Sequence, residues 1–432
     1  MHSVPSLPAQ TVGLVTRRLL PFLMLLYLVA YIDRANISVA ALQMNADLGL
    51  TARMYGLGAG LFYVTYILFE VPSNVILARV GARRWIARIM VTWGLVACGM
   101  AFIQTAKHLY VVRLLLGAAE AGFTPGIIYY ISRWFPSSHR ARAMSFFYIA
   151  AALASVIGLP LSGALLQLDG TGGFAGWRWL YFVEGVPAIV LGLVVLKYLP
   201  DHPAEAGWLS AAQRDWLTRT IADESAHAPA GHAGGWRQAF SDATVWWLSL
   251  FWLAQAFGTI GVTLFLPQIL KNLSGATNFI VSLLSALPFL LACALMYLNS
   301  RHSDATHERR FHLGVPLLIS GVLLTLSVFA GNLTATYWLL LVAVGLNWAV
   351  TPVFWAVTTE YLAGGVAAAG AIALINAVAN IAGVGLPPLL GYLKDRNGDY
   401  SGGLLLIAGA LLGGGLLGLG LIRRATTPRC RN

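Results

Sequence analysis

The stretch YLVAYIDRANISVA, from Tyr27 to Ala40, places an acid beside a base in an otherwise apolar run. The two charged residues are Asp33 and Arg34, and the apolar run around them covers about residues 18–42. In water such a pair is ordinary. Near the middle of a bilayer, each charge costs roughly 2.5–3.5 kcal/mol on insertion scales. The meaning of the pair therefore depends on the solvent that surrounds this run.

The composition of the whole chain identifies that solvent. Of the 432 residues, 58% are hydrophobic and only 10% are charged, and the mean hydropathy is +0.72. Soluble domains carry roughly 25% charged residues, so this chain could not cover its surface with polar groups. We therefore predict an all-α, multi-pass membrane protein. The cysteines give no disulfide framework, and residues 1–16 lack the features of a signal peptide.

Twelve apolar runs are long enough to cross a bilayer, which takes about 20 helical residues. They cover approximately residues 18–42, 54–78, 84–105, 108–132, 142–168, 177–199, 244–270, 277–300, 311–331, 334–361, 367–393 and 402–422. A long polar insert divides these runs six and six. We therefore predict two six-helix domains, residues 1–199 and 244–432, joined by a cytoplasmic linker at 200–243. Paired arginines after the second and eighth runs suggest the parallel halves seen in some transporters.

The positions of lysine and arginine predict the orientation. With the N-terminus in the cytoplasm, 20 of the 28 basic residues fall in cytoplasmic segments and six in outer segments. The remaining two, Arg34 and Arg113, lie inside spans. The positive-inside rule therefore places both termini and the linker in the cytoplasm. The net charge of +11 reflects this topology, so we expect no nucleic-acid partner.

Charges inside membrane spans mark functional sites by default. For Asp33 and Arg34 the simpler alternative is a structural salt bridge to another helix. Tyr31 shares a helix face with Arg34, and the second run carries Tyr66 and Glu70 on one face. We expect a polar site where these faces meet.

The fourth run repeats the anomaly of the first. Arg113, Gly117, Glu120 and Thr124 recur at the spacing of one helix face. Arg113 and Glu120 could then reach a common site, and Gly117 would leave room there for another chain or a substrate.

These residue types suggest how an anion could be coupled to protons. Arginine binds a carboxylate bidentately and keeps its charge. Burial disfavours an ionised carboxyl group, a nearby arginine favours it, and an anion that competes for the arginine shifts the balance towards protonation. We therefore expect proton coupling at Asp33 and Glu120, and substrate binding at Tyr31, Arg34, Tyr66 and Arg113.

The C-terminal half offers polar and aromatic groups without buried charge. Asn347, Thr351, Trp355 and Thr358 follow the tenth run at helical spacing, and Asn376 lies in the eleventh. Hydrogen bonding between helices explains such residues equally well. Trp355 and Asn376 are the two that we expect to contact substrate.

Several classes of chemistry find no support in the sequence. It contains no Walker A motif, no H-E-x-x-H and no CxxC. His302, His307 and His312 are five residues apart, a spacing that does not place them on one helix face where they could bind a metal together. We expect neither an enzyme nor a metal or cofactor site.

Five stretches together resemble the anion:cation symporter family of the major facilitator superfamily. They are YIDRANISVAAL, FEVPSNVILARVGARRWIARI, RLLLGAAEAGFTPGIIYYISRWFP, GWRWLYFVEGVPAIVLGLVVLKYLPDHP and ALINAVANIAGVGLPPLLGYLKD, which occur in this order along nearly the whole chain. The resemblance implies a monomeric rocker-switch transporter of organic anions in the inner membrane of a bacterium. Bacterial tartrate and phthalate transporters are the most similar members.

The resemblance also implies roles for single residues. The family's proton-coupling carboxylates fall on Asp33 and Glu120, and its arginines fall on Arg34 and Arg113. Some sugar-acid transporters of the family have a glutamine at the position that Ala151 occupies here. Its absence argues against a substrate with the hydroxyl pattern of galactonate.

The loop motif of the superfamily normally contains an aspartate. Its place in the first half is taken by Ala78, whereas the second half keeps Asp304. We therefore expect gating to depend on Arg79, Arg83, Asp304 and Arg309.

The sequence thus predicts a symporter that imports a carboxylate together with protons. An anion exchanger or exporter with the same fold is the alternative. A receptor-like or structural membrane protein would require the buried charges to be inert.

Overall fold

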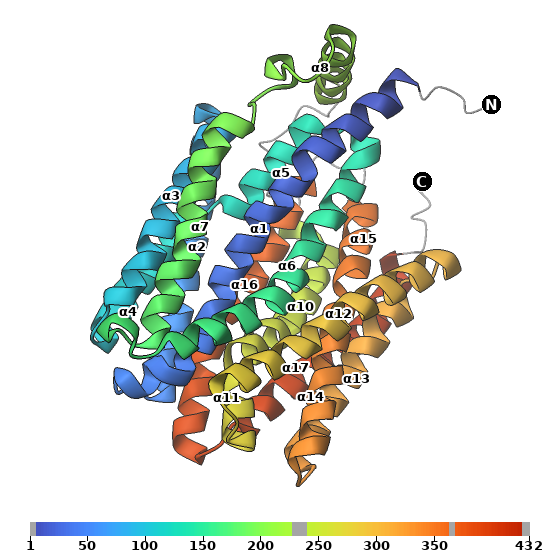
Figure 1. The fold of residues 1–432 in the computed structure, drawn as a ribbon. Coiled ribbons are helices and arrows are strands. Elements are labelled where there is room, and N and C mark those ends of the chain that lie inside the picture. The colour runs from blue at the N-terminus through green and yellow to red at the C-terminus, as the bar shows by residue number, and fades with distance from the viewer. Residues whose placement is uncertain (1–5, 227–239, 363–367, 426–432) are drawn as a thin grey trace, which may run out of the picture.

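The structure is a computed structural model that describes residues 6–226, 240–362 and 368–425. Helices dominate because a bilayer offers backbone groups no partners outside the chain. Within these residues, twelve helical stretches are long and apolar enough to cross a membrane, so the predicted twelve-helix fold is confirmed (Figure 1).

The first six spans are α1 (Leu7–Asp47), α2 (Ala52–Val80), α3 (Ala82–Gly99), α4 (Ala106–Glu120) with α5 (Phe123–Trp134), α6 (Ser137–Leu165) and α7 (Gly176–Tyr198). The last six are α10 (Ala243–Ala256) with α11 (Thr263–Ser274), α12 (Asn278–Thr306), α13 (Arg310–Phe329), α14 (Leu333–Ala349) with α15 (Thr351–Leu362), α16 (Ala368–Asn397) and α17 (Ser401–Ala425). Between the two sets, α8 (Ala211–Ala226) lies outside the bundle, at the end where α1 begins (Figure 1).

Three spans that look continuous in the sequence are interrupted. The fourth breaks between α4 and α5, where Gly122 adopts a left-handed φ of +86°. The seventh contains a π-helical segment, Phe257–Val262, and the tenth breaks at Val350. The expectation that Arg113 and Thr124 share one continuous helix face is therefore wrong, because the break separates them.

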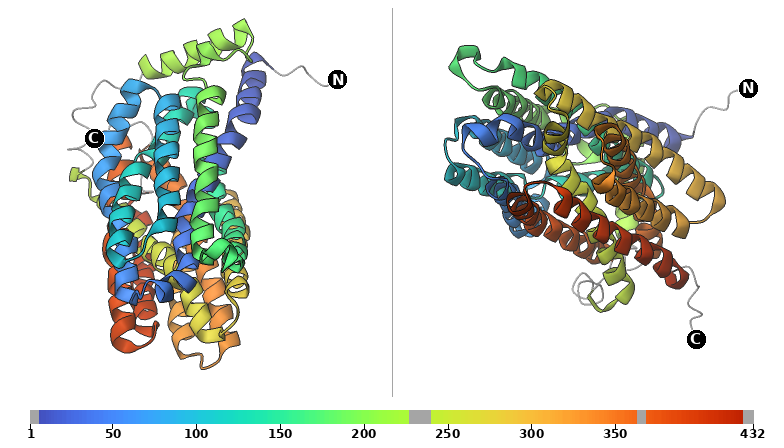
Figure 2. Two further views of the ribbon diagram at one scale, coloured as in Figure 1. Left: turned by 60° about the vertical axis from the view of Figure 1, so that its left-hand side comes forward. Right: turned by 90° about the horizontal axis from the view of Figure 1, so that it is seen from below.

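The two halves meet closely at the end of the bundle opposite α8, with α2 against α16 and α1 against α11 (Figure 2). A methyl group added to Gly56 would lie 2.1 Å from the carbonyl oxygen of Pro387. The backbone N–H groups of Ala52 and Arg53 donate to the carboxylate of Asp395 at 3.0 and 2.9 Å. Small residues and a capping carboxylate thus hold this end closed.

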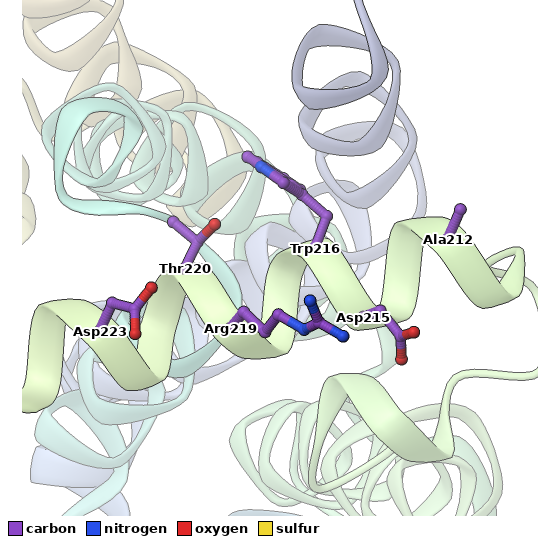
Figure 3. Close-up of a pocket in the computed structure, with 6 residues that line it drawn as sticks. All are labelled: Ala212, Asp215, Trp216, Arg219, Thr220 and Asp223. Atoms are coloured by element: carbon purple, nitrogen blue, oxygen red, sulfur yellow. The ribbon is translucent and has the colours of Figure 1, made fainter.

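A shallow hollow lies on α8, lined by Ala212, Asp215, Trp216, Arg219, Thr220 and Asp223 (Figure 3). All of its lining residues belong to this one helix outside the bundle. It is therefore separate from the buried charges that the sequence singles out.

Candidate anion site and buried carboxyl groups

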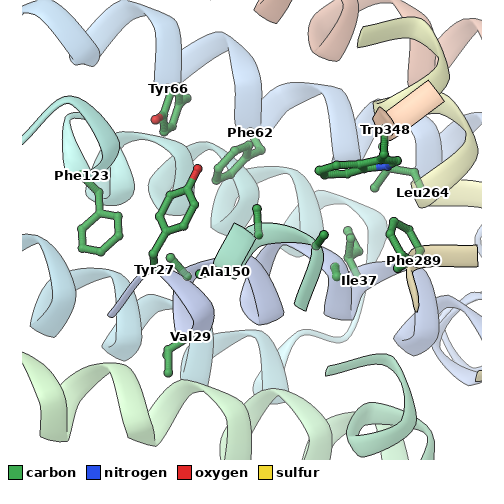
Figure 4. Packing of buried hydrophobic residues seen from close by; sticks show 14 of the residues in the cluster. Tyr27, Val29, Ile37, Phe62, Tyr66, Phe123, Ala150, Leu264, Phe289 and Trp348 are labelled. Carbon is green, nitrogen blue, oxygen red and sulfur yellow. The ribbon is translucent and has the colours of Figure 1, made fainter. Parts of the chain in front are cut away.

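A buried ion pair joins the first and fourth spans. Arg34 Nε lies 2.6 Å from Glu120 Oε1, with the Glu120 side chain fully buried and that of Arg34 23% exposed. Glu120 is the last residue of α4, directly before the break. Rings of Tyr31, Phe62 and Tyr66 surround the guanidinium, with centroids 5.5, 5.8 and 4.9 Å away. Figure 4 shows Phe62 and Tyr66 side by side on α2.

This ion pair leaves hydrogen-bonding capacity unused. Arg34 Nη2 and Glu120 Oε2 are both buried, and neither has a hydrogen-bond partner in the structure. An unsatisfied buried polar group costs roughly 1–3 kcal/mol, and more when it is charged. An acceptor oxygen of a ligand can therefore bind Arg34 Nη2, and a proton on Glu120 Oε2 would remove the buried charge of that carboxylate.

Arg113 hydrogen-bonds to the backbone of the second span. Its guanidinium donates to the backbone carbonyls of Gly58 and Ala59 on α2, at 3.2 and 3.4 Å, and lies over the Phe62 ring at 4.8 Å. The ion-pair partner of Glu120 is thus Arg34 and not Arg113. Arg113 remains a charged neighbour of Glu120.

Gly117 does not open space for a substrate. A methyl group on it would lie 2.1 Å from the carbonyl oxygen of Phe62 and 2.4 Å from Thr65 Oγ1. The sequence left open whether another segment of the chain or a substrate lies beside Gly117. The structure places α2 there. The glycine lets α4 approach α2 closely.

Asp33 faces away from the ion pair of its neighbour. Its carboxylate accepts from Trp93 Nε1 at 2.9 Å and from Asn36 Nδ2 at 3.2 Å. Adjacent helical residues point about 100° apart, so Asp33 reaches α3 while Arg34 reaches α4. Arg113 is also a charged neighbour of Asp33.

A third buried carboxyl group was missed in the sequence. Glu184 on α7 is 5% exposed and accepts from Ser162 Oγ on α6 at 2.6 Å. Asn36 is a polar neighbour of both Glu184 and Asp33. The available signal was a single acidic residue in the middle of the apolar run 177–199, the same kind of signal that identified Asp33.

The expected residues of the C-terminal half lie on other helices. Trp355 on α15 packs in an aromatic group with Trp252 and Phe354, and Asn376 on α16 is half-buried. No contact recorded for the described residues joins Trp355 or Asn376 to Arg34. Their roles as substrate contacts stay predictions.

In the same half, hydrogen bonds between polar side chains join the seventh and tenth spans. Gln255 Nε2 donates to Thr259 Oγ1 at 2.8 Å, and Asn347 Nδ2 donates to the same hydroxyl at 3.1 Å. Thr259 belongs to the π-helical segment, a feature that is frequent at functional sites. The distortion thus lies where the seventh and tenth spans meet.

The expected gating residues divide between the two halves. In the first, Arg83 donates its backbone N–H to Asp201 at 2.8 Å and places its guanidinium 3.4 Å from the same carboxylate. Asp201 follows α7 and caps the start of α3. The loop between α2 and α3 thus contacts an acid, although Ala78 replaces the aspartate of the loop motif. Arg79 is exposed and has no recorded partner among the described residues.

In the second half, Arg309 bridges two acids. It pairs with Asp304 at the end of α12 and with Glu360 on α15, at 2.8 Å from the latter. These contacts hold α12, α13 and α15 together at the end of the bundle where α8 lies. A gating role for the four residues stays a prediction.

Comparisons with known proteins agree with this architecture. Residues 23–387 match the sequence profile of the Major Facilitator Superfamily. A putative tartrate transporter of Agrobacterium vitis is 44% identical over 95% of this chain and 94% of its own length. A quinolone resistance transporter of Acinetobacter baumannii is 39% identical, over 93% of each chain.

Among solved structures, an inward-facing bacterial homologue of the human lysosomal transporter Spinster superposes with a TM-score of 0.74. The sequences are 19% identical, and the match covers 95% of this chain and 97% of the other. This likeness concerns the fold alone. With its twelve spans and a profile match over most of its length, the chain belongs to the Major Facilitator Superfamily and is a membrane transporter, not an enzyme.

Proposed function

We propose that the protein imports an organic anion together with protons by alternating access, across the inner membrane of a bacterium. The observation that carries the proposal is the Arg34–Glu120 pair, which is buried, surrounded by aromatic rings and incompletely hydrogen-bonded. The 44% identical relative named as a putative tartrate transporter supports a small carboxylate as the substrate class.

The pair suggests how binding and protonation are coupled. A substrate carboxylate competes with Glu120 for the Arg34 guanidinium, which it can bind bidentately. Glu120 is then left as a buried charge without its counter-ion, and a proton neutralises it at lower cost than desolvation of the charge. Anion and proton therefore enter the site together, while Arg113 balances the remaining negative charge nearby.

The closed end of the bundle defines the state of the cycle. The contacts between α2 and α16 lie opposite α8, and the positive-inside rule assigns α8 to the cytoplasm. The closed end then faces outwards. We infer that this state would release anion and proton to the cytoplasm.

The test is transport by purified protein in proteoliposomes with the variant Glu120→Gln, which resembles the protonated state. We expect the variant to retain substrate counterflow, because binding and reorientation of the loaded carrier need no deprotonation. Uphill uptake driven by a pH gradient should be lost. If both activities survive, Glu120 does not carry the coupling proton, and if both disappear, its role is structural.

The second candidate is an exporter or exchanger, and the 39% identical relative named as a quinolone resistance transporter favours it. An exchanger would show counterflow without any response of uptake to a pH gradient in the unsubstituted protein. An exporter would expel substrate against its gradient when the outside is acidic. The same proteoliposomes therefore separate the three activities.

A further inference from the structure

We propose that Asp33 and Glu184 together hold one proton, and that Glu184 is a further proton-carrying residue of the transport cycle. The proposal rests on the proposed proton coupling for its second part only. Its first part, a shared proton in a buried carboxyl pair, rests on burial, hydrogen bonding and the balance of charge and does not depend on transport.

The first argument is the balance of charge inside the N-terminal half. Its described spans bury three carboxyl groups, those of Asp33, Glu120 and Glu184. The guanidinium of Arg34 lies against Glu120, and that of Arg113 is a charged neighbour of Glu120 and Asp33. Arg34 is taken by Glu120 at 2.6 Å. Only Arg113 remains to balance two carboxyl groups, so one of these two must be neutral to avoid an uncompensated buried charge.

The second argument is the surroundings of Glu184. One oxygen accepts from Ser162 Oγ at 2.6 Å, whereas Oε2 is buried without a hydrogen-bond partner. No ion pair to Glu184 is found within the described parts of the chain. A buried carboxylate that lacks both a counter-ion and a full set of donors is strongly disfavoured, but a neutral carboxylic acid is tolerated there.

The third argument is the link between the two carboxyl groups. Asn36 donates to Asp33 Oδ1 at 3.2 Å and is also a polar neighbour of Glu184. The pair then has two forms of equal net charge: in one the proton is bonded to a Glu184 oxygen and Asp33 is ionised, and in the other it is bonded to an Asp33 oxygen and Glu184 is ionised. The net charge of the pair stays at one negative unit, matched to Arg113.

The titratable or charged groups around the pair come from α3, α4 and α7, whereas α6 contributes the hydroxyl of Ser162. They are Cys98 on α3, Arg113 and Glu120 on α4, and Tyr181 on α7. Arg113 is the only permanent cation in this set. The protonation of Glu120 in the anion site therefore changes the charge that Arg113 must balance, which connects the pair to substrate binding.

The direct test is infrared spectroscopy of the purified full-length protein in lipid nanodiscs, where a protonated carboxylic acid has a C=O band distinct from that of a carboxylate. We expect Glu184→Gln to remove such a band at neutral pH. Asp33→Asn should remove it as well, because Glu184 then ionises to balance Arg113. Glu360→Gln, at an exposed cytoplasmic-end acid, is the control that should leave the band unchanged.

A band that persists in full in Glu184→Gln overturns the shared proton. A band that Glu184→Gln removes and Asp33→Asn leaves unchanged shows that Glu184 is protonated independently of Asp33, which overturns the pairing. Neither result requires transport, so both stay informative if the proposed symport fails.

The second part is tested in proteoliposomes by the ratio of protons to anions, measured from the pH gradient that just stops net uptake. We expect Glu184→Gln to keep counterflow and to lower this ratio. An unchanged ratio would show that the Glu184 proton is not carried through the cycle. Absence of pH-driven uptake in the unsubstituted protein would instead overturn the proposed function.

Discussion

Arg34 is the residue on which anion binding depends most directly in the proposed mechanism. Its guanidinium is the partly exposed partner of the pair, with one nitrogen still free. Removing one member of a buried, hydrogen-bonded charge pair at a binding site costs about 2–5 kcal/mol. We therefore expect Arg34→Ala to weaken carboxylate binding roughly 30-fold or more, measured by thermal shift or calorimetry on purified protein.

Two further variants make this result specific. Arg34→Lys should rescue binding poorly, because an ammonium lacks the fork that grips two carboxylate oxygens. Arg53→Ala removes an exposed cation that lies over Tyr392 at the outer end and should leave affinity unchanged. Unaltered affinity in Arg34→Ala would remove this residue from the site.

At the scale of single residues, sequence reasoning found unusual residues but not their partners. Asp33, Arg34 and Glu120 were identifiable because a charge in an apolar run is costly. The sequence placed Arg113 and Glu120 near a common site but did not reveal that Glu120 pairs with Arg34, because that contact joins two spans whose relative rotation no local pattern fixes. Glu184 was overlooked although its span carries the same signal.

Among the elements, the break in the fourth span positions the end of α4 and therefore Glu120. Gly122 has a φ of +86°, and a methyl group on it would lie 2.2 Å from Ser73 Oγ. A non-glycine residue in the left-handed conformation costs roughly 1–2 kcal/mol, and the close contact adds to this. We expect Gly122→Ala to lower the thermal stability of the purified protein and to weaken anion binding.

The matched control is Gly99→Ala at the end of α3, where an added methyl group meets no atom within 4 Å. This control should be neutral or slightly stabilising, since alanine is the better helix former. Equal stability of the two variants would show that the break does not require glycine at position 122.

The sequence predicted the helices well and their interruptions poorly. Long apolar runs flanked by loops specify a helical span almost by composition, since a helix satisfies all of its backbone hydrogen bonds within one segment in lipid. The break at Val350 lies two residues before Pro352, so a proline in the tenth run was an available signal for it. The π-helical segment at Phe257–Val262 contains no proline. It depends on packing between spans, which periodicity in one span does not report.

For the whole molecule, the arginine distribution makes a firm prediction about orientation. In a variant without its three cysteines, we expect Ala212→Cys on α8 to be labelled only after permeabilisation of cells. Thr171→Cys, between α6 and α7, should react with an impermeant reagent in intact cells. Labelling of position 212 from outside would reverse the orientation and, with it, the inward-open assignment.

The closure of the end opposite α8, which we propose to face outwards, depends on a contact between the two halves that the sequence did not reveal. Asp395 of α16 accepts from the first N–H groups of α2, where the helix dipole also favours a negative charge. The contact cannot persist when the halves separate, so it stabilises only the outer-closed state. Losing a cap of this kind costs about 0.5–2 kcal/mol.

We therefore expect Asp395→Ala to shift the conformational equilibrium towards an open outer end by roughly two- to 30-fold, and Asp395→Asn to shift it less, because the amide keeps one acceptor oxygen. Spin labels at Thr171 and Leu333, in the outer segments of the two halves, report the change as a larger population of long distances. Asp399→Asn is the control, since that nearby acid contacts Ser401 of its own half. Distance distributions that match the unsubstituted protein in both Asp395 variants would mean that close packing of Gly56 against Pro387 suffices to keep the outer end shut.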